Sequence, residues 1–137
     1  MKIRQLFRRQ RPDDGPRLAD DGTLMVVGSS FDPGVADSVV IGQIADRGID
    51  LTRPMLLRHH LRLPDPLAVE EARRIVAQDG YALRVDEDEP EDDGLHVRVS
   101  RPQQVTALAI AQERSRMVAL VQRLGGHVAG WDLLAAR

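Results

Sequence analysis

Residues 57–63 alternate between two kinds of side chain, and this alternation restricts the fold more than any other feature of the sequence. The segment reads Leu-Arg-His-His-Leu-Arg-Leu. A period of two predicts a β-strand that turns one face towards a core and the other away from it. The same period recurs over residues 81–85 and 95–99. We therefore expect a sheet with one aliphatic face and one charged face.

Helical patterns separate these strands. Asp65-Pro66 is typical of a helix start, and a long helix later in the chain ends at Gly125-Gly126. The sequence does not decide where the long helix begins, because residues 105–110 fit either helix or extended chain. A last short strand follows the two glycines. Over about 55–134 the order is strand, helix, strand, strand, helix, strand. It predicts an α+β fold, a ferredoxin-like βαββαβ sandwich with both helices on one face of the sheet.

An additional N-terminal helix is expected ahead of this core, over about residues 33–47. Asp32-Pro33 is typical of a cap followed by a first helical residue, and Gly48 suits the left-handed residue that ends a helix. The apolar run at 24–27 precedes this helix and fits either a short strand or a lead-in segment.

The formal net charge of −2 conceals a separation of charge along the chain. Residues 1–17 contain six basic and two acidic residues, whereas residues 86–93 read DEDEPEDD. A chain of 137 residues allows one domain plus a tail. We interpret 1–20 as a flexible basic tail and 21–137 as a single domain; the alternative for the tail is an arm that binds anionic lipid, RNA or an acidic partner. The acidic run fits a solvated hairpin loop or an acidic docking strip.

The charged face of the sheet is the first candidate binding surface. In the predicted topology the strands at 57–63 and 95–99 are central, so their outward side chains should form one basic patch. Such a patch suits phosphates or an acidic partner segment; the alternatives are a merely solvated face, or a face neutralised by the acidic loop. The face carries no aromatic side chain, which argues against base stacking. The predicted residues are Arg58, His60, Arg62, Arg84, His96 and Arg98.

Several chemistries lack the residues that they require. The chain has no cysteine, no glycine-rich phosphate loop and no convincing set of nucleophile, histidine and acid. His59 and His60 face opposite sides of a strand and so do not share a metal ion. His59 is expected to be a hydrogen-bonded core histidine. We therefore predict no enzyme activity, no metal and no cofactor. No apolar run of 18 residues exists, so no membrane span is expected.

Four segments carry a resemblance to a known family. They are Gly48-Ile49-Asp50-Leu51, the strand from Arg58 to Pro64, Gly80-Tyr81-Ala82-Leu83, and the ending Gly125-Gly126-His127-Val128-Ala129-Gly130-Trp131. Over about residues 35–134 the chain resembles the regulator of ribonuclease activity B family. That resemblance implies a ferredoxin-like fold and a cytoplasmic protein that binds ribonuclease E and lowers its activity without chemistry of its own. Where the family favours Glu-Tyr-Asp, this chain has His-Val-Ala at 127–129.

The resemblance completes the set of candidate partner-binding residues. The partner it implies is ribonuclease E or a related RNA-processing factor. Alternatives from the residues alone are a nucleic-acid-binding module that uses the basic face and tail, and a small-ligand sensor dimer. Gly130 is expected to permit close backbone approach, and Trp131 to cap the core with its N–H on a backbone oxygen, or else to be an exposed hot spot. Besides the basic face, the predicted residues are Asp86, Glu87, Asp88, Glu89 and Trp131.

Overall fold

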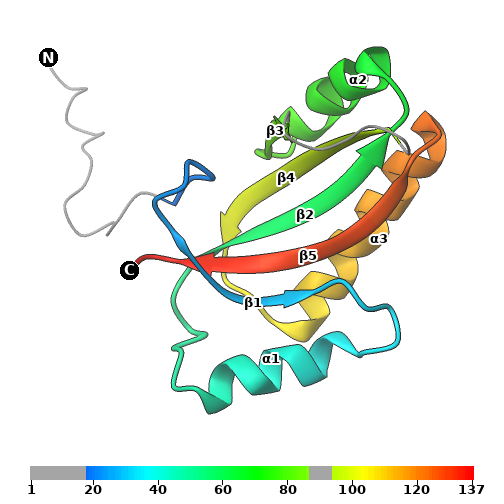
Figure 1. The fold of residues 1–137 in the computed structure, drawn as a ribbon. Coiled ribbons are helices and arrows are strands. Elements are labelled where there is room, and N and C mark those ends of the chain that lie inside the picture. The colour runs from blue at the N-terminus through cyan, green and yellow to red at the C-terminus, as the bar shows by residue number, and fades with distance from the viewer. Residues whose placement is uncertain (1–17, 87–93) are drawn as a thin grey trace, which may run out of the picture.

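A computed structural model describes residues 18–86 and 94–137 of the chain. One antiparallel sheet of five strands lies against three helices (Figure 1). The predicted α+β character is therefore confirmed. In chain order the elements are β1 (Met25–Ser30), α1 (Asp37–Asp46), β2 (Met55–Leu63), α2 (Pro66–Ala77), β3 (Ala82–Asp86), β4 (Leu95–Gln103), α3 (Ala107–Leu124) and β5 (His127–Ala135).

The strands lie in the order β1-β5-β2-β4-β3, and every neighbouring pair is antiparallel. β2 is the middle strand, with β4 and β5 on its two sides. The segment for which two interpretations were open is a strand, because β1 pairs with β5 from Met25↔Ala135 to Ser30↔Trp131. The sheet thus has one strand more than the predicted core, at the edge beyond β5.

The main core lies between the sheet and the helices. Leu57, Leu61 and Leu63 of β2 are completely buried on this side, as their spacing of two predicts. One apolar cluster joins β2, β3 and β4 to α2 and α3, and a second joins β1, β2 and β5 to α1 and α3. The opposite face of the sheet buries only a small apolar cluster, which is centred on Leu56 and Leu134.

The residues that predicted the start of α2 and the end of α3 occupy those positions in the structure. The Asp65 carboxylate accepts a hydrogen bond from the Ala68 N–H at 2.9 Å, and Pro66 is the first helical residue. Thr106 caps α3 in the same way, through the Ala109 N–H at 3.0 Å, which settles where the long helix begins. Gly125 ends α3 with a φ of 81°, a conformation that favours glycine.

The predicted start of α1 is wrong by four residues, since the helix begins at Asp37 and not at Pro33. The Asp32 carboxylate accepts from the Gly34 N–H at 2.9 Å, and the Val35 N–H donates to the Asp32 carbonyl. Asp32 therefore closes a turn instead of capping a helix. This turn ends β1 and separates it from α1.

Trp131 belongs to the core and joins three elements. Its side chain is 1% exposed, and it lies on the helix side of β5. The indole N–H donates to the Asp37 carboxylate at 3.1 Å, not to a backbone oxygen as predicted, and Arg114 donates to the same oxygen at 2.8 Å. The carboxylate of α1 thus connects β5 to α3.

Replacing Trp131 with phenylalanine should lower the free energy of unfolding by about 2 kcal/mol. The smaller ring leaves a gap in the core, and Asp37 loses one of its two hydrogen-bond donors. Urea unfolding followed by circular dichroism measures the change. Leu108→Ala, at an exposed position of α3, should shift stability by less than about 0.5 kcal/mol. Equal losses in both variants would contradict the assigned role of Trp131.

Candidate functional site

The predicted basic side chains do lie on one face of the sheet. β2 and β4 place His60 opposite Arg98 and Arg62 opposite His96, and β3 places Arg84 opposite Arg98. Residues that are directly opposite in an antiparallel pair lie on the same side. This face, which the three helices do not cover, is called the open face below.

Two carboxylates that the sequence did not reveal neutralise much of the open face. The Arg58 guanidinium donates to Asp132 of β5 through Nε at 2.8 Å and Nη2 at 2.7 Å. Its Nη1 donates to Asp20 at 2.8 Å. Asp20 and Asp132 are both buried, and Arg58 is nearly so. Arg58 is therefore part of the framework of the sheet rather than a group that is offered to a ligand.

The pairing shifts the acidity of both partners. Burial alone would raise the pKa of Asp132, but the nearby His60 ring and the hydrogen bonds from Arg58 outweigh it, so the pKa lies below the usual value. Burial would lower the pKa of Arg58, yet the bonds to Asp132 and the charge of Asp20 raise it above the ordinary value. Both groups thus remain charged across the physiological pH range.

A pair of histidines extends this network across the open face. His60 Nδ1 and His96 Nε2 are 2.8 Å apart, and their rings are stacked. His60 Nε2 is 3.1 Å from Asp132, and His96 Nδ1 is 3.3 Å from Asp86. The two rings therefore lie between two carboxylates. Among residues 18–86 and 94–137, no three His, Asp or Glu side chains are placed to hold a metal ion.

A hollow of about 360 Å³ opens on this face beside Asp20 and Asp21. Arg58, Arg84 and Arg98 line it together with Asp20 and Asp21. Arg98 lies 3.5 Å from Asp20, whereas Arg84 is exposed. The hollow is therefore lined by both positively and negatively charged side chains, whereas a uniformly basic patch was predicted.

Phe31 is an aromatic side chain on the open face, so the prediction that the face has none is wrong. Its ring meets the His60 ring edge-on, with centroids 5.0 Å apart, and it is 51% exposed. A Cβ at Gly130 would overlap this ring and the Ser30 carbonyl oxygen. The predicted close approach at Gly130 is thus confirmed. Phe31 follows the last residue of β1, and strand alternation did not reveal its position.

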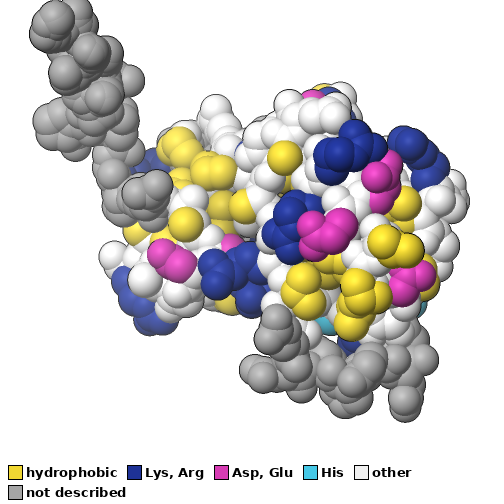
Figure 2. Space-filling model, turned by 90° about the horizontal axis from the view of Figure 1, so that it is seen from above, with side chains coloured by type: hydrophobic (Ala, Val, Ile, Leu, Met, Phe, Trp, Pro, Cys, Tyr) yellow, Lys and Arg dark blue, Asp and Glu magenta, His cyan; other side chains and the backbone are white. Residues whose placement is uncertain are grey.

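The remaining predicted residues lie apart. Asp86 is at the end of β3 and contacts His96. Trp131 is buried on the helix side of the sheet, so it is no exposed hot spot. Glu87, Asp88 and Glu89 fall outside the described residues. Figure 2 shows the α2 side of the molecule, where acidic and basic side chains are interspersed. On α2, Glu70 pairs with Arg73 and Glu71 with Arg74.

A second polar cluster, also missed from the sequence, is buried between α3 and the sheet. Glu113 of α3 accepts hydrogen bonds from Tyr81 and, at 2.7 Å, from Arg101. The Arg101 guanidinium also lies 4.4 Å from the centre of the Tyr81 ring. His59 Nε2 is 3.7 Å from Glu113, too far for a hydrogen bond, so the prediction of a hydrogen-bonded His59 is wrong.

The contacts within this cluster stabilise the charged form of Glu113. Burial would raise the pKa of Glu113, but the contact with His59, the bond from Tyr81 and the charge of Arg101 bring it down to about 2. Burial and Glu113 together raise the pKa of Tyr81 above its usual value.

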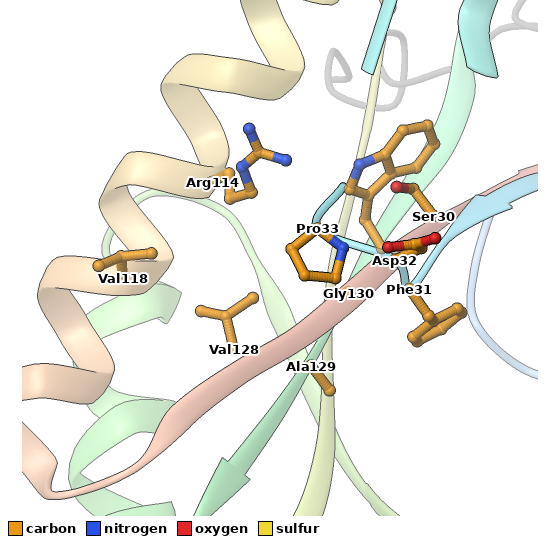
Figure 3. Close-up of a pocket in the computed structure, with 10 residues that line it drawn as sticks. Ser30, Phe31, Asp32, Pro33, Arg114, Val118, Val128, Ala129 and Gly130 are labelled. Carbon is orange, nitrogen blue, oxygen red and sulfur yellow. The ribbon is translucent and has the colours of Figure 1, made fainter. Parts of the chain in front are cut away.

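A further hollow, of about 320 Å³, lies where β5 emerges beyond the end of β1 (Figure 3). Val118 and Arg114 of α3 form one wall, and the turn after β1 forms the other. Figure 3 shows Val128 pointing towards α3, while Ala129 and Phe31 point to the other side of β5.

Comparison with known proteins settles the family. A model for the family described as regulator of ribonuclease activity B matches residues 35–133. The chain belongs to this family. No curated protein and no solved structure matches it. The matched range runs from the turn before α1 into β5, so β1 and Asp20 lie outside it. Among the described residues, no helix is long and apolar enough to cross a membrane.

Glu113→Gln should remove a pH-dependent part of the stability. Because the pKa of Glu113 is about 2 in the folded protein and 4.5 without the fold, its carboxylate stabilises the protein above pH 4.5 and loses this effect as the pH falls through 2. The wild-type protein should exceed the variant by about 3 kcal/mol at pH 7 and by far less at pH 2. Urea unfolding at both pH values tests this. Glu70→Gln, at an exposed site on α2, should leave the pH profile unchanged.

Asp132→Asn should lower the free energy of unfolding by about 3 kcal/mol, because it leaves the buried Arg58 guanidinium without its bidentate partner. The triple variant Asp20→Asn, Arg58→Leu and Asp132→Leu should recover part of that loss, since both carboxylates that bond to Arg58 are then neutral as well. Denaturant unfolding measures the stability of both variants. A triple variant less stable than Asp132→Asn would contradict the argument.

Proposed function

We propose that this protein regulates a ribonuclease by binding to it, and that the ribonuclease is ribonuclease E or a related RNA-processing factor. The observation that carries the proposal is the family match over residues 35–133, because the family is described by its regulation of ribonuclease activity. The protein then acts in the cytoplasm, without chemistry of its own.

The geometry of both polar clusters supports a binding role. On the open face, the buried carboxylate of Asp132 accepts hydrogen bonds from Arg58 and lies 3.1 Å from His60. Behind the sheet, Glu113 accepts hydrogen bonds from Tyr81, Arg101 and Gln103. Ionisable groups fixed in this way give a rigid surface instead of a reactive site.

The order of the strands supports the finer fold assignment. Within the core, β5-β2-β4-β3 is the order of a split βαβ unit, with β2 and β4 in the middle. We therefore assign a ferredoxin-like core, to which β1 and α1 are added at the β5 edge. Such a core presents one face of its sheet without helices, which suits the attachment of a partner.

The proposal predicts that the purified chain slows ribonuclease E. Cleavage of a fluorogenic RNA by the purified ribonuclease should fall in a saturable way as the chain is added, and biolayer interferometry should show direct binding of the two proteins. An unrelated ribonuclease serves as control and should retain its rate. Absence of both binding and inhibition at several salt concentrations would overturn the proposal.

The same assay separates this proposal from nucleic-acid binding. If the chain acted by sequestering RNA, the inhibition would weaken as more RNA was added, and a gel shift would show the chain on RNA alone. The guanidinium nearest the middle of the sheet, that of Arg58, donates hydrogen bonds to the carboxylates of Asp20 and Asp132. Few of its N–H groups are therefore left for RNA phosphates. We therefore expect inhibition that depends on the concentration of the ribonuclease and not on that of the RNA.

A further inference from the structure

β1 is an outer strand of the sheet whose side chains give it no protection against a further strand. Its six residues, Met-Val-Val-Gly-Ser-Ser, contain no proline and no charged side chain. Met25 is 41% exposed and Val26 is 49% exposed. The unpaired amides and carbonyls of an outer strand are a template for pairing with another chain. A short uncharged segment of this kind readily pairs with copies of itself.

A side chain from outside the strand covers this edge. The pairing of β1 with β5 is irregular between Val26 and Gly28, so Val27 is the extra residue of a bulge. Because the extra residue is left out of the hydrogen-bond ladder, its carbonyl needs a donor from elsewhere. The Arg47 guanidinium donates a hydrogen bond to the Val27 carbonyl. Arg47 directly follows α1 and thus connects the end of this helix to the backbone of β1.

Arg47 reaches β1 from the side that faces away from β5. α1 contacts β1 and lies on that side of it in Figure 1. A hollow of about 410 Å³ lies beside β1 here, and its lining comes from β1, α1 and Arg47. Gly28 and Ser29 are the strand residues in this lining. The guanidinium therefore occupies the place where the backbone of an added strand would run.

β3, the other outer strand, has the same kind of cover. Arg73 of α2 donates to the Leu83 carbonyl at 2.8 Å. β3 also carries charged side chains, of which Arg84 is exposed. β1 has no charge of its own, so its cover depends on Arg47. Asp46 lines the same hollow as Arg47, so the closure of β1 comes from the occupied carbonyl and not from a net charge.

We propose that Arg47 keeps the chain monomeric by closing β1 against a second copy of the same chain. Without this contact, two β1 strands pair antiparallel about a two-fold axis and continue the sheet from one copy into the other. The second copy is the occupant that the sequence of β1 favours, because an uncharged strand pairs with itself without repulsion. This inference is independent of the proposed function.

Sedimentation velocity of the full chain over a range of concentrations tests the closure. The wild-type protein should sediment as one chain throughout. Arg47→Ala should form a dimer whose share rises with concentration, because the Val27 carbonyl is then open to a further strand. Arg53→Ala is the matched control, since Arg53 is exposed in the segment between α1 and β2 and the variant loses the same charge. This control should remain monomeric.

A second substitution separates edge pairing from a general loss of folding. Val26→Lys places a charge on β1 itself, so the double variant Arg47→Ala with Val26→Lys should return to a monomer. Leu108→Lys adds the same charge at an exposed position of α3, and combined with Arg47→Ala it should leave the dimer intact. Aggregation of an unfolded chain would not distinguish these two positions. Thermal unfolding by circular dichroism checks that each variant is folded.

Hydrogen exchange locates the pairing. The Arg47→Ala dimer should show slowed amides in β1, compared with the same variant diluted to the monomer. An Arg47→Ala variant that stays monomeric, or a wild-type chain or Arg53→Ala variant that associates equally well, overturns the proposal. Slowed amides outside β1 overturn it too, as does a return to the monomer with Leu108→Lys or a failure to return with Val26→Lys.

Discussion

Arg58 lies near the middle of β2, the middle strand of the sheet, and its side chain is only 12% exposed on the open face. A buried cation of this kind is tolerated only with matched partners. Asp132 supplies two parallel hydrogen bonds and Asp20 a third. These bonds tie the N-terminal end of the domain to β2 and β5. The histidine pair then continues from Asp132 towards β3. The polar framework of the open face thus depends on this one side chain.

The alternation of residues 57–63 was enough to predict the sheet and its two chemically different faces. The capping residue Asp65 and the terminal glycine Gly125 placed helix ends for the same reason: each acts on backbone groups a few residues away. α1 was placed four residues too early because Asp32 can cap a helix or close a turn, and the local sequence permits both. In the structure Asp32 closes the turn, and Asp37, where α1 begins, accepts the hydrogen bond from Trp131.

The candidate site was harder to predict, because its key partners are distant in sequence. The signs of Arg58, His60 and Arg98 were visible, but Asp132 is 74 residues from Arg58 and Asp20 is 38 residues away on the other side. A pattern of period two gives the face of a residue, not the charge that another strand places beside it. Phe31 and Glu113 were also missed. Phe31 lies just after β1, outside the strand alternation, and Glu113 is the polar residue of an otherwise apolar helix face.

The turn at Asp32–Gly34 has a consequence beyond the placement of α1. β1 and β5 leave their common register at Trp131 because the chain must bend there, and the proline that follows Asp32 has no N–H to offer a neighbouring strand. The turn therefore determines where the pairing of β1 with β5 ends. Had the strand run on for a few more residues, β1 would have paired with residues 127–129 as well.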